Sequence, residues 1–216
     1  MSTPVSHVSS VNVGRPRLVR LRNRTISTAI WKAPVAGRVA LRGVNLDGDD
    51  QADRSVHGGP DKAVYAYAAD DTAWWEAELG RELGPGAFGE NLTLEGVEVT
   101  GAVIGERWAI GSAVLEVCQP RLPCFKLGLR MEDPRFPKRF AAELRTGAYA
   151  RILEEGEIGA GDEVRIVHRP DHGVTAGLVA EAILHDHRLA ARIADAPELS
   201  RDWDEWIDRH AAGSQA

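Results

Sequence analysis

The chain has few cysteines and lacks the short motifs of several large enzyme classes. Its 216 residues include only two cysteines, Cys118 and Cys124, which excludes a disulfide scaffold and a four-cysteine zinc site. No G-x-x-x-x-G-K-[ST], H-E-x-x-H, C-x-x-C or G-x-S-x-G pattern occurs. Phosphate-loop binding, zincin-type hydrolysis, dithiol redox chemistry and a serine nucleophile of the α/β-hydrolase type therefore have no support in the sequence.

Long apolar segments are absent too. The first residues, MSTPVSHVSS, show no basic region followed by an apolar core, and no stretch approaches the length needed to cross a bilayer. We therefore expect a cytoplasmic protein without membrane contact, in which both thiols stay reduced.

Positive charge is in the minority, because 26 lysines and arginines stand against 32 acids, for a formal net charge of −6. This balance excludes broad, sequence-independent binding to phosphate backbones. The charge is uneven along the chain, however. Residues 1–30 hold five arginines and no acid, and residues 119–140 sum to +4, whereas residues 70–90 and 171–216 each sum to −5. We interpret the N-terminal arginines as a solvated face.

The order of turn signals and apolar runs predicts an α+β protein that is mainly β. The length fits one domain with an appendage, and 44% hydrophobic residues can supply a core. Many short runs separated by glycines are typical of a small closed or nearly closed β-barrel. We expect strands at Arg17–Arg22, Arg38–Val44, Lys62–Ala68, Asn91–Leu94, Glu106–Ile110, Ala113–Cys118, Tyr149–Leu153 and Asp162–His168.

Helical patterns interrupt the strands and then replace them. One helix is expected from about Asp70 to Leu79, with Asp70 or Asp71 as N-cap and Gly80 as its stop, and another from about Pro137 to Leu144. After a boundary near residues 170–173, apolar residues recur at helical spacing. We therefore predict a barrel domain over residues 1–170 and a small helical module over 171–216, in which Thr175 is the first N-cap.

The two cysteines differ in their surroundings. Cys118 continues the alternation of a strand and is most simply a small buried filler. Cys124 follows Pro120 and Pro123, which hold the chain in a stiff extended turn. Arg121 and Lys126 are close in sequence and favour the thiolate, which is the form that attacks electrophiles or binds soft metals. A functional role and a structural role for Cys124 are equally supported by these residues alone.

Other candidate site residues stand beside turns. The His57-Gly-Gly-Pro turn carries a histidine at its rim and is flanked by Arg54 and Lys62, which could hold an anion. A histidine that only caps the turn is the simpler interpretation. Lys32 could add a third cation, and Asn91 could read the amide edge of a heterocycle or serve as a turn residue. We expect His185 and His187 to be surface residues, not metal ligands.

Three longer segments carry a resemblance to a known family. They read RSVHGGPDKAVYAY at residues 54–67, FGENLT at 88–93 and QPRLPCFKL at 119–127. In this order they resemble the MOSC-domain family, specifically its stand-alone YiiM-like branch, and the helical tail resembles the three-helix module of that branch. The resemblance implies a MOSC-type β-barrel that binds the pterin-based molybdenum cofactor.

The resemblance also implies roles for individual residues. Cys124 would ligate the metal, and Lys32, Arg54, Lys62 and Arg121 are candidate cations for the phosphate of the pterin. His57 and Asn91 would line the pocket, and we expect His57 to be the proton donor. Similar proteins reduce N-hydroxylated compounds such as hydroxylaminopurines to amines, with electrons from a separate reductase protein.

Two other functions remain open from the sequence. Cys124 could carry a persulfide, or the protein could be a molybdenum-cofactor carrier, with no substrate reduced. A barrel that binds single-stranded nucleic acid through the N-terminal arginines and Trp31 is a further alternative, which the net charge disfavours. Trp203 and Trp206 in the tail are either core residues or a docking surface for the electron donor. The oligomeric state, including a possible homodimer, is open.

Overall fold

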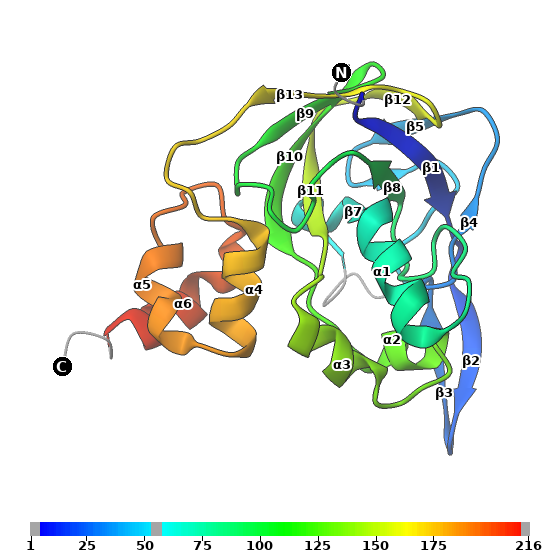
Figure 1. The fold of residues 1–216 in the computed structure, drawn as a ribbon. Helices are drawn as coiled ribbons and strands as arrows, with labels where there is room; N and C mark the ends of the chain where they lie inside the picture. The colour runs from blue at the N-terminus through cyan, green and yellow to red at the C-terminus, as the bar shows by residue number, and fades with distance from the viewer. Residues whose placement is uncertain (1–4, 53–57, 213–216) are drawn as a thin grey trace.

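The computed structural model describes residues 5–52 and 58–212 of the chain. Figure 1 shows a strand-rich part with helices packed against it, and a separate group of C-terminal helices at its lower left. The observed class is α+β and mainly β, with a C-terminal helical part, as the sequence predicts.

One eight-stranded sheet forms the main body. Its neighbours pair in the order β13-β9-β10-β11-β7-β8-β1-β4, and every pair is antiparallel except β7 with β8. The strands are β1 (His7–Val13), β4 (Ala33–Pro34), β7 (Val64–Ala68), β8 (Leu92–Glu95), β9 (Arg107–Ile110), β10 (Ala113–Pro120), β11 (Ala148–Glu154) and β13 (Val164–His168).

The sheet curls until its far sides meet. An isolated bridge joins His7 of β1 to Glu163, just before β13, and the backbone N–H of Val8 donates to the carbonyl of Asp162 at 2.9 Å. A few bonds, and not a full ladder, therefore close the sheet on itself. The expected barrel is present as a nearly closed sheet.

Two smaller sheets complete the β structure. β5 (Arg38–Arg42) pairs with β6 (Asn45–Leu46) and β12 (Gly156–Gly159), and β5 and β12 lie at the upper right of Figure 1. β2 (Arg17–Leu21) and β3 (Arg24–Thr28) form a hairpin that projects from the body at the lower right of Figure 1.

The helices fall into two groups. α1 (Ala69–Leu79), α2 (Phe125–Arg130) and α3 (Phe136–Glu143) pack beside the sheet, and a 3₁₀ helix η1 spans Pro60–Lys62. The C-terminal group consists of α4 (Ala176–Leu184), η2 (His187–Leu189), α5 (Ala190–Ile193), η3 (Arg201–Trp203) and α6 (Asp204–Ala211). Thr175 is the N-cap of α4 as predicted, because its side chain accepts from the backbone N–H of Leu178 at 3.0 Å.

The core explains why the C-terminal helices stay on the sheet. Buried residues of the sheet such as Trp108 and Leu115 belong to the same apolar cluster as Val179 of α4 and Ile193 of α5. A second, aromatic cluster lies under α1 and α3 and includes Tyr67, among others. The predicted boundary near residues 170–173 falls between β13 and α4, but the apolar packing is continuous across it, and the division into domains stays a prediction.

Two local expectations are wrong. Lys62 is not in a strand, because Pro60 starts a 3₁₀ helix there and β7 begins only at Val64. Ala68 is the N-cap of α1, and Asp71 lies in its first turn with its carboxylate 2.5 Å from Arg145. Cys124 has the extended backbone that the two prolines predict, and α2, a short helix that was not predicted, begins at the next residue.

No helix within residues 5–52 and 58–212 is both long enough and apolar enough to cross a membrane.

Candidate functional site

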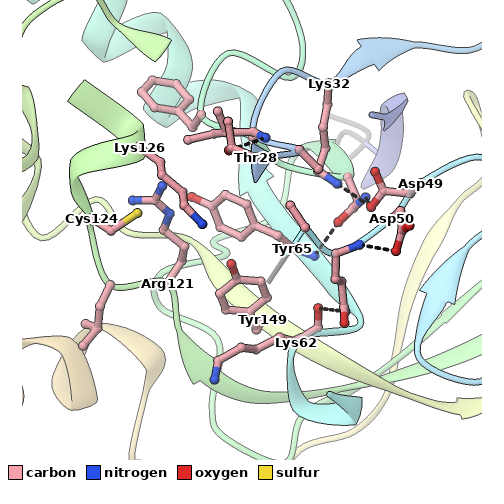
Figure 2. Close-up of a pocket in the computed structure, with 18 residues that line it drawn as sticks. Thr28, Lys32, Asp49, Asp50, Lys62, Tyr65, Arg121, Cys124, Lys126 and Tyr149 are labelled. Atoms are coloured by element: carbon pink, nitrogen blue, oxygen red, sulfur yellow. Dashed lines mark hydrogen bonds and ion pairs between the residues drawn. The ribbon is translucent and has the colours of Figure 1, made fainter. Parts of the chain in front are cut away.

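A pocket opens where the hairpin, the end of β10 and the loops before β7 and β8 come together. Figure 2 shows its walls: Cys124, Arg121 and Lys126 lie on one side, Lys32 and Asp49 on the other, and the rings of Tyr65 and Tyr149 between them. The lining residues are Thr28, Ala29, Ile30, Lys32, Asp49, Asp50, Gln51, Ala52, Lys62, Tyr65, Phe88, Gly89, Asn91, Arg121, Leu122, Cys124, Lys126 and Tyr149.

The Cys124 side begins where β10 ends at Pro120. Cys124 has extended backbone (φ −131°, ψ 169°) and is half-buried, and its thiol makes no cap hydrogen bond to α2. The proline-bounded turn therefore holds a thiol at the wall of the pocket without using it for structure.

Arg121 is the least satisfied group in the pocket. Its residue is only 5% exposed, yet its Nη1 has no hydrogen-bond partner among the described residues. The guanidinium carbon lies 5.5 Å from the ring centre of Phe140 and 5.9 Å from that of Tyr65. A buried N–H without an acceptor costs about 1–3 kcal/mol, and more when the group is charged, so this side of the pocket is built for an anionic or acceptor ligand.

Two tyrosines form the floor between the sides. Their ring centres are 5.2 Å apart, and the hydroxyl of Tyr65 donates to the carbonyl of Thr146 at 2.9 Å. Burial raises the pKa of both Tyr65 and Tyr149, so both phenols stay neutral. The floor therefore offers flat, uncharged surface to a ring system.

The opposite side of the pocket is internally neutralised. Asp49 is nearly inaccessible and accepts from Gly14 N (2.7 Å), from Asn91 Nδ2 (2.9 Å) and from the Lys32 ammonium, which is paired with it. Burial lowers the pKa of Lys32, and the Asp49 carboxylate opposes that shift. The backbone N–H of Tyr65 donates to Asn91 Oδ1 at 3.1 Å. Both polar ends of Asn91 and the charge of Lys32 are thus used within the fold.

A second buried carboxylate supports this side from below. Glu90 accepts from the backbone N–H groups of Gly86 (2.6 Å) and Phe88 (3.0 Å) and from the hydroxyl of Thr93 (3.1 Å). Burial raises the pKa of Glu90, and these hydrogen bonds oppose that effect. Residues 84–89 match the spelling G-x-G-x-x-G, but they form turns before a strand, and Glu90 takes up two of their N–H groups. This segment is therefore not a dinucleotide phosphate loop.

Lys62 reaches the pocket from η1 and meets the C-terminal part of the chain. Its Nζ lies 2.5 Å from Asp202 Oδ2, at the start of η3. The carboxylate of the neighbouring Asp61 accepts a hydrogen bond from Nε of Arg151 at 2.8 Å. Nη2 of the same arginine donates to the carbonyl of Glu198 at 3.1 Å. The helical module is thus tied to the rim of the pocket by charge as well as by its core.

Cys118 has the structural role that the sequence predicts. It is fully buried, and its thiol donates to the carbonyl of Asp61 at 3.2 Å. Burial raises the pKa of this thiol far above its ordinary value, so it stays protonated and unreactive.

Of the predicted site residues, the structure brings five to one pocket: Lys32, Lys62, Asn91, Arg121 and Cys124. Arg54 and His57 lie outside the described residues. His185 and His187 are exposed surface residues, as expected. Across residues 5–52 and 58–212, no group of three or more His, Cys, Asp or Glu side chains could hold a metal ion.

Sequence reasoning missed two carboxylates and a tyrosine of this region. Asp49 stands in the acidic run Asp47-Gly-Asp-Asp50, which gives no sign of its buried partners. Asp202 meets Lys62 across 140 residues of sequence. Tyr149 is placed by the pairing of β11 with β7, where it lies opposite Tyr65, and its position in a predicted strand was the one available signal.

Comparison with known proteins gives consistent matches over most of the chain. The family model described as "MOSC domain" matches residues 53–165. "Uncharacterized protein YflK" of Bacillus subtilis (strain 168) is 37% identical over 199 residues, covering 91% of this chain and 90% of that protein. "Protein YiiM" of Escherichia coli (strain K12) is 29% identical over 182 residues, covering 82% and 81%.

Solved structures and one longer protein extend these matches. The crystal structure of YiiM from Geobacillus stearothermophilus superposes with a TM-score of 0.78 at 32% identity, over 95% of this chain and 98% of that one. A protein named "Reductase" from Gibberella moniliformis (strain M3125 / FGSC 7600) is 38% identical over 149 residues, which are 67% of this chain and 26% of that protein.

Proposed function

Because the chain belongs to the MOSC domain family, we propose that it binds a molybdenum–pterin cofactor and reduces N-hydroxylated compounds to amines. Relatives named YiiM and a relative named "Reductase" support a role related to the molybdenum cofactor and an oxidoreductase activity. The observation that carries the proposal is the buried Nη1 of Arg121, which has no hydrogen-bond partner in the described part of the chain and lies in the same pocket wall as the thiol of Cys124.

The residues present fit such a cofactor. Cys124 offers a soft sulfur ligand of the kind that suits a metal already bound by sulfur. Arg121, Lys126 and Lys62 are cations on the wall that could contact a phosphate, and the tyrosine floor offers flat apolar surface to a pterin ring. When bound, the cofactor would supply the two-electron chemistry that breaks an N–O bond.

The overall reaction balances as R–NHOH plus two electrons and two protons giving R–NH2 and water. The chain's own part is to hold the metal through Cys124, to neutralise the pterin phosphate and to keep the ring system on the tyrosines. His57 as proton donor to the amine nitrogen stays a prediction. The electrons come from a separate donor protein, because no flavin or haem motif was found in the sequence.

The test is to purify the protein from molybdenum-replete cells and to measure molybdenum and pterin per chain. Reduction of a hydroxylaminopurine is then followed with dithionite-reduced methyl viologen as electron source. We expect wild type to bind close to one metal per chain, and Cys124→Ser to lose most metal and at least about a hundredfold of the activity, because the one protein ligand is removed. Cys118→Ala is the matched control, since it also removes one thiol but lies outside the pocket, and it should keep the metal.

The same samples test the competing carrier functions. If mass spectrometry detects a persulfide on Cys124 and the protein holds no molybdenum, the protein is a sulfur carrier and the proposed reductase function is wrong. Bound cofactor without turnover of any N-hydroxylated compound would replace it by cofactor carriage.

A further inference from the structure

A second hollow lies on the outer face of the pocket wall, between the β2–β3 hairpin and α2. Its volume is about 420 Å³, and its lining is mainly apolar, with two arginines: Leu21, Arg22, Arg24, Phe125, Gly128, Leu129 and Pro134. Phe125, at the start of α2, is 52% exposed at this hollow. An exposed aromatic ring beside Leu21, Leu129 and Pro134 in one hollow marks a surface that another molecule covers.

We term this hollow the hairpin groove. The hairpin beside it carries positive charge that no nearby acid balances. Arg15, Arg20, Arg22 and Arg24 are exposed, and none of them forms an ion pair within the described part of the chain. Arg17 lies over the ring of Trp31, 3.7 Å from its centre. On the C-terminal module, by contrast, Arg188 and Arg192 each form an ion pair with a nearby aspartate. The unpaired arginines therefore favour an acidic partner.

The hairpin groove and the Cys124 pocket share their walls. Phe125 lines the groove while its neighbour Cys124 lines the pocket, and consecutive Cα atoms are 3.8 Å apart. The hairpin does the same from the other side, because Leu21 and Arg24 face the groove and Thr28, where β3 ends, faces the pocket. The same two segments, the hairpin and the start of α2, therefore contribute residues to both the groove and the pocket.

We propose that the hairpin groove is the docking site of the electron donor, a small redox protein with an acidic face around an apolar centre. This inference rests on the proposed function, because only a redox reaction in the pocket needs a donor there. Each turnover takes two electrons from the partner, whose reduced centre is oxidised, and uses them with two protons to convert R–NHOH into R–NH2 and water. The apolar hollow supplies contact area, and the arginines steer the partner and set its orientation.

Other occupants fit this surface less well. Nucleic acid would use the arginines, but the centre of the groove is aliphatic and holds one aromatic ring, Phe125, so it lacks a platform on which successive bases could stack. A second copy in a two-fold dimer would place the same arginines against each other, with no acid on the hairpin to balance them.

The experiment measures binding of a plant-type [2Fe–2S] ferredoxin, an acidic one-electron carrier, to the full-length protein by calorimetry at low and at high salt. We expect Arg22→Glu/Arg24→Glu to weaken binding by roughly tenfold or more at low salt, and added salt to remove most of the difference. The matched control is Arg42→Glu/Arg165→Glu, which changes the net charge equally at exposed arginines on other strands and should weaken binding by less than about threefold. A thermal melt confirms that both variants fold.

Activity then separates this inference from the proposed function. In loaded protein, reversal of the groove charges should slow hydroxylaminopurine reduction with two equivalents of reduced ferredoxin, and leave the rate with reduced methyl viologen unchanged. No reduction with methyl viologen in wild type sinks the proposed function and leaves the binding result to be judged alone. Equal weakening of ferredoxin binding by both charge variants overturns the docking site. So does tighter binding of an oligonucleotide than of ferredoxin, or a wild-type dimer that the groove variant dissociates.

Discussion

The two sides of the pocket balance their charges in opposite ways. On one side, Asp49 gathers the Lys32 ammonium, the Asn91 amide and the Gly14 N–H, and every charge has its partner within the fold. On the other side, the Arg121 guanidinium is just as enclosed, but its Nη1 has no acceptor within residues 5–52 and 58–212. It shares this wall with a thiol that makes no cap hydrogen bond.

This difference separates a structural side from a ligand-binding side. A buried ion pair is costly to break but adds little that a ligand can use. A buried donor without an acceptor raises the free energy of the folded protein, and a ligand that supplies the acceptor removes this penalty. Loss of a cation on the Asp49 side should therefore lower the free energy of unfolding, whereas loss of a cation on the Arg121 side should lower ligand binding. Substitution of one cation on each side tests this difference.

The largest expected effect is on the Asp49 side. Lys32→Met leaves the Asp49 carboxylate buried with two neutral donors and no counter-charge, so we expect a loss of about 3 kcal/mol in the free energy of unfolding. Urea denaturation followed by tryptophan fluorescence measures it. Lys126→Met is the control on the other side, where the ammonium is half-buried and takes part in no ion pair among the described residues, and its cost should stay below about 1 kcal/mol.

One outcome would reverse the assignment of the two sides. If Lys32→Met keeps the wild-type free energy of unfolding and loses the cofactor instead, Lys32 serves the ligand, as the sequence predicted, and not the fold.

A smaller effect of the opposite kind is expected for Arg121→Met. The substitution removes a charged donor whose Nη1 has no hydrogen-bond partner among the described residues, and it keeps much of the apolar stem. The free energy of unfolding should therefore change by less than about 1 kcal/mol. Pterin retained by the purified protein should fall roughly tenfold or more, because a charge-assisted hydrogen bond to the phosphate is lost. Fluorescence of the oxidised pterin measures the retained amount. Arg121→Lys keeps the charge but not the forked geometry and should fall between the two.

An Arg121→Met protein that unfolds several kcal/mol more easily than wild type, and still holds its pterin, would show that the guanidinium is structural on this side too.

Most strands were predictable, and the exceptions have physical causes. Glycine turns and apolar alternation located β5, β8, β9, β10, β11 and β13 to within about two residues. β1 was missed because two of its inward residues are polar, and they are satisfied only in the fold. Ser10 donates to Asn12 at 2.8 Å, and Asn12 donates to Thr93 of β8 at 3.2 Å. α2 was missed because six residues are too few to show a helical period.

The site was predictable as a set of residues but not as a set of contacts. The motifs lie at the ends of adjacent strands and at their connecting turns, so their side chains converge, as expected for loops at one end of a barrel. Lys32 pairs with Asp49, which lies 17 residues away in the sequence, and Lys62 pairs with Asp202, which lies 140 residues away. A local sequence pattern does not indicate such distant pairs. The sequence therefore could not show which carboxylate each lysine contacts.

The smallest effect is expected where the two sides meet the C-terminal module, at the pair of Lys62 and Asp202. The carboxylate is 55% exposed, so Asp202→Asn should cost less than about 1 kcal/mol of unfolding free energy. It also releases the Lys62 ammonium at the rim of the pocket, and pterin retention should rise by about two- to threefold if that ammonium contacts the phosphate. Lys62→Met, measured in the same assay, should lower retention. If Asp202→Asn lowers retention as well, the carboxylate positions the lysine for its ligand instead of competing with that ligand, and Lys62 then belongs with the Asp49 side of the comparison.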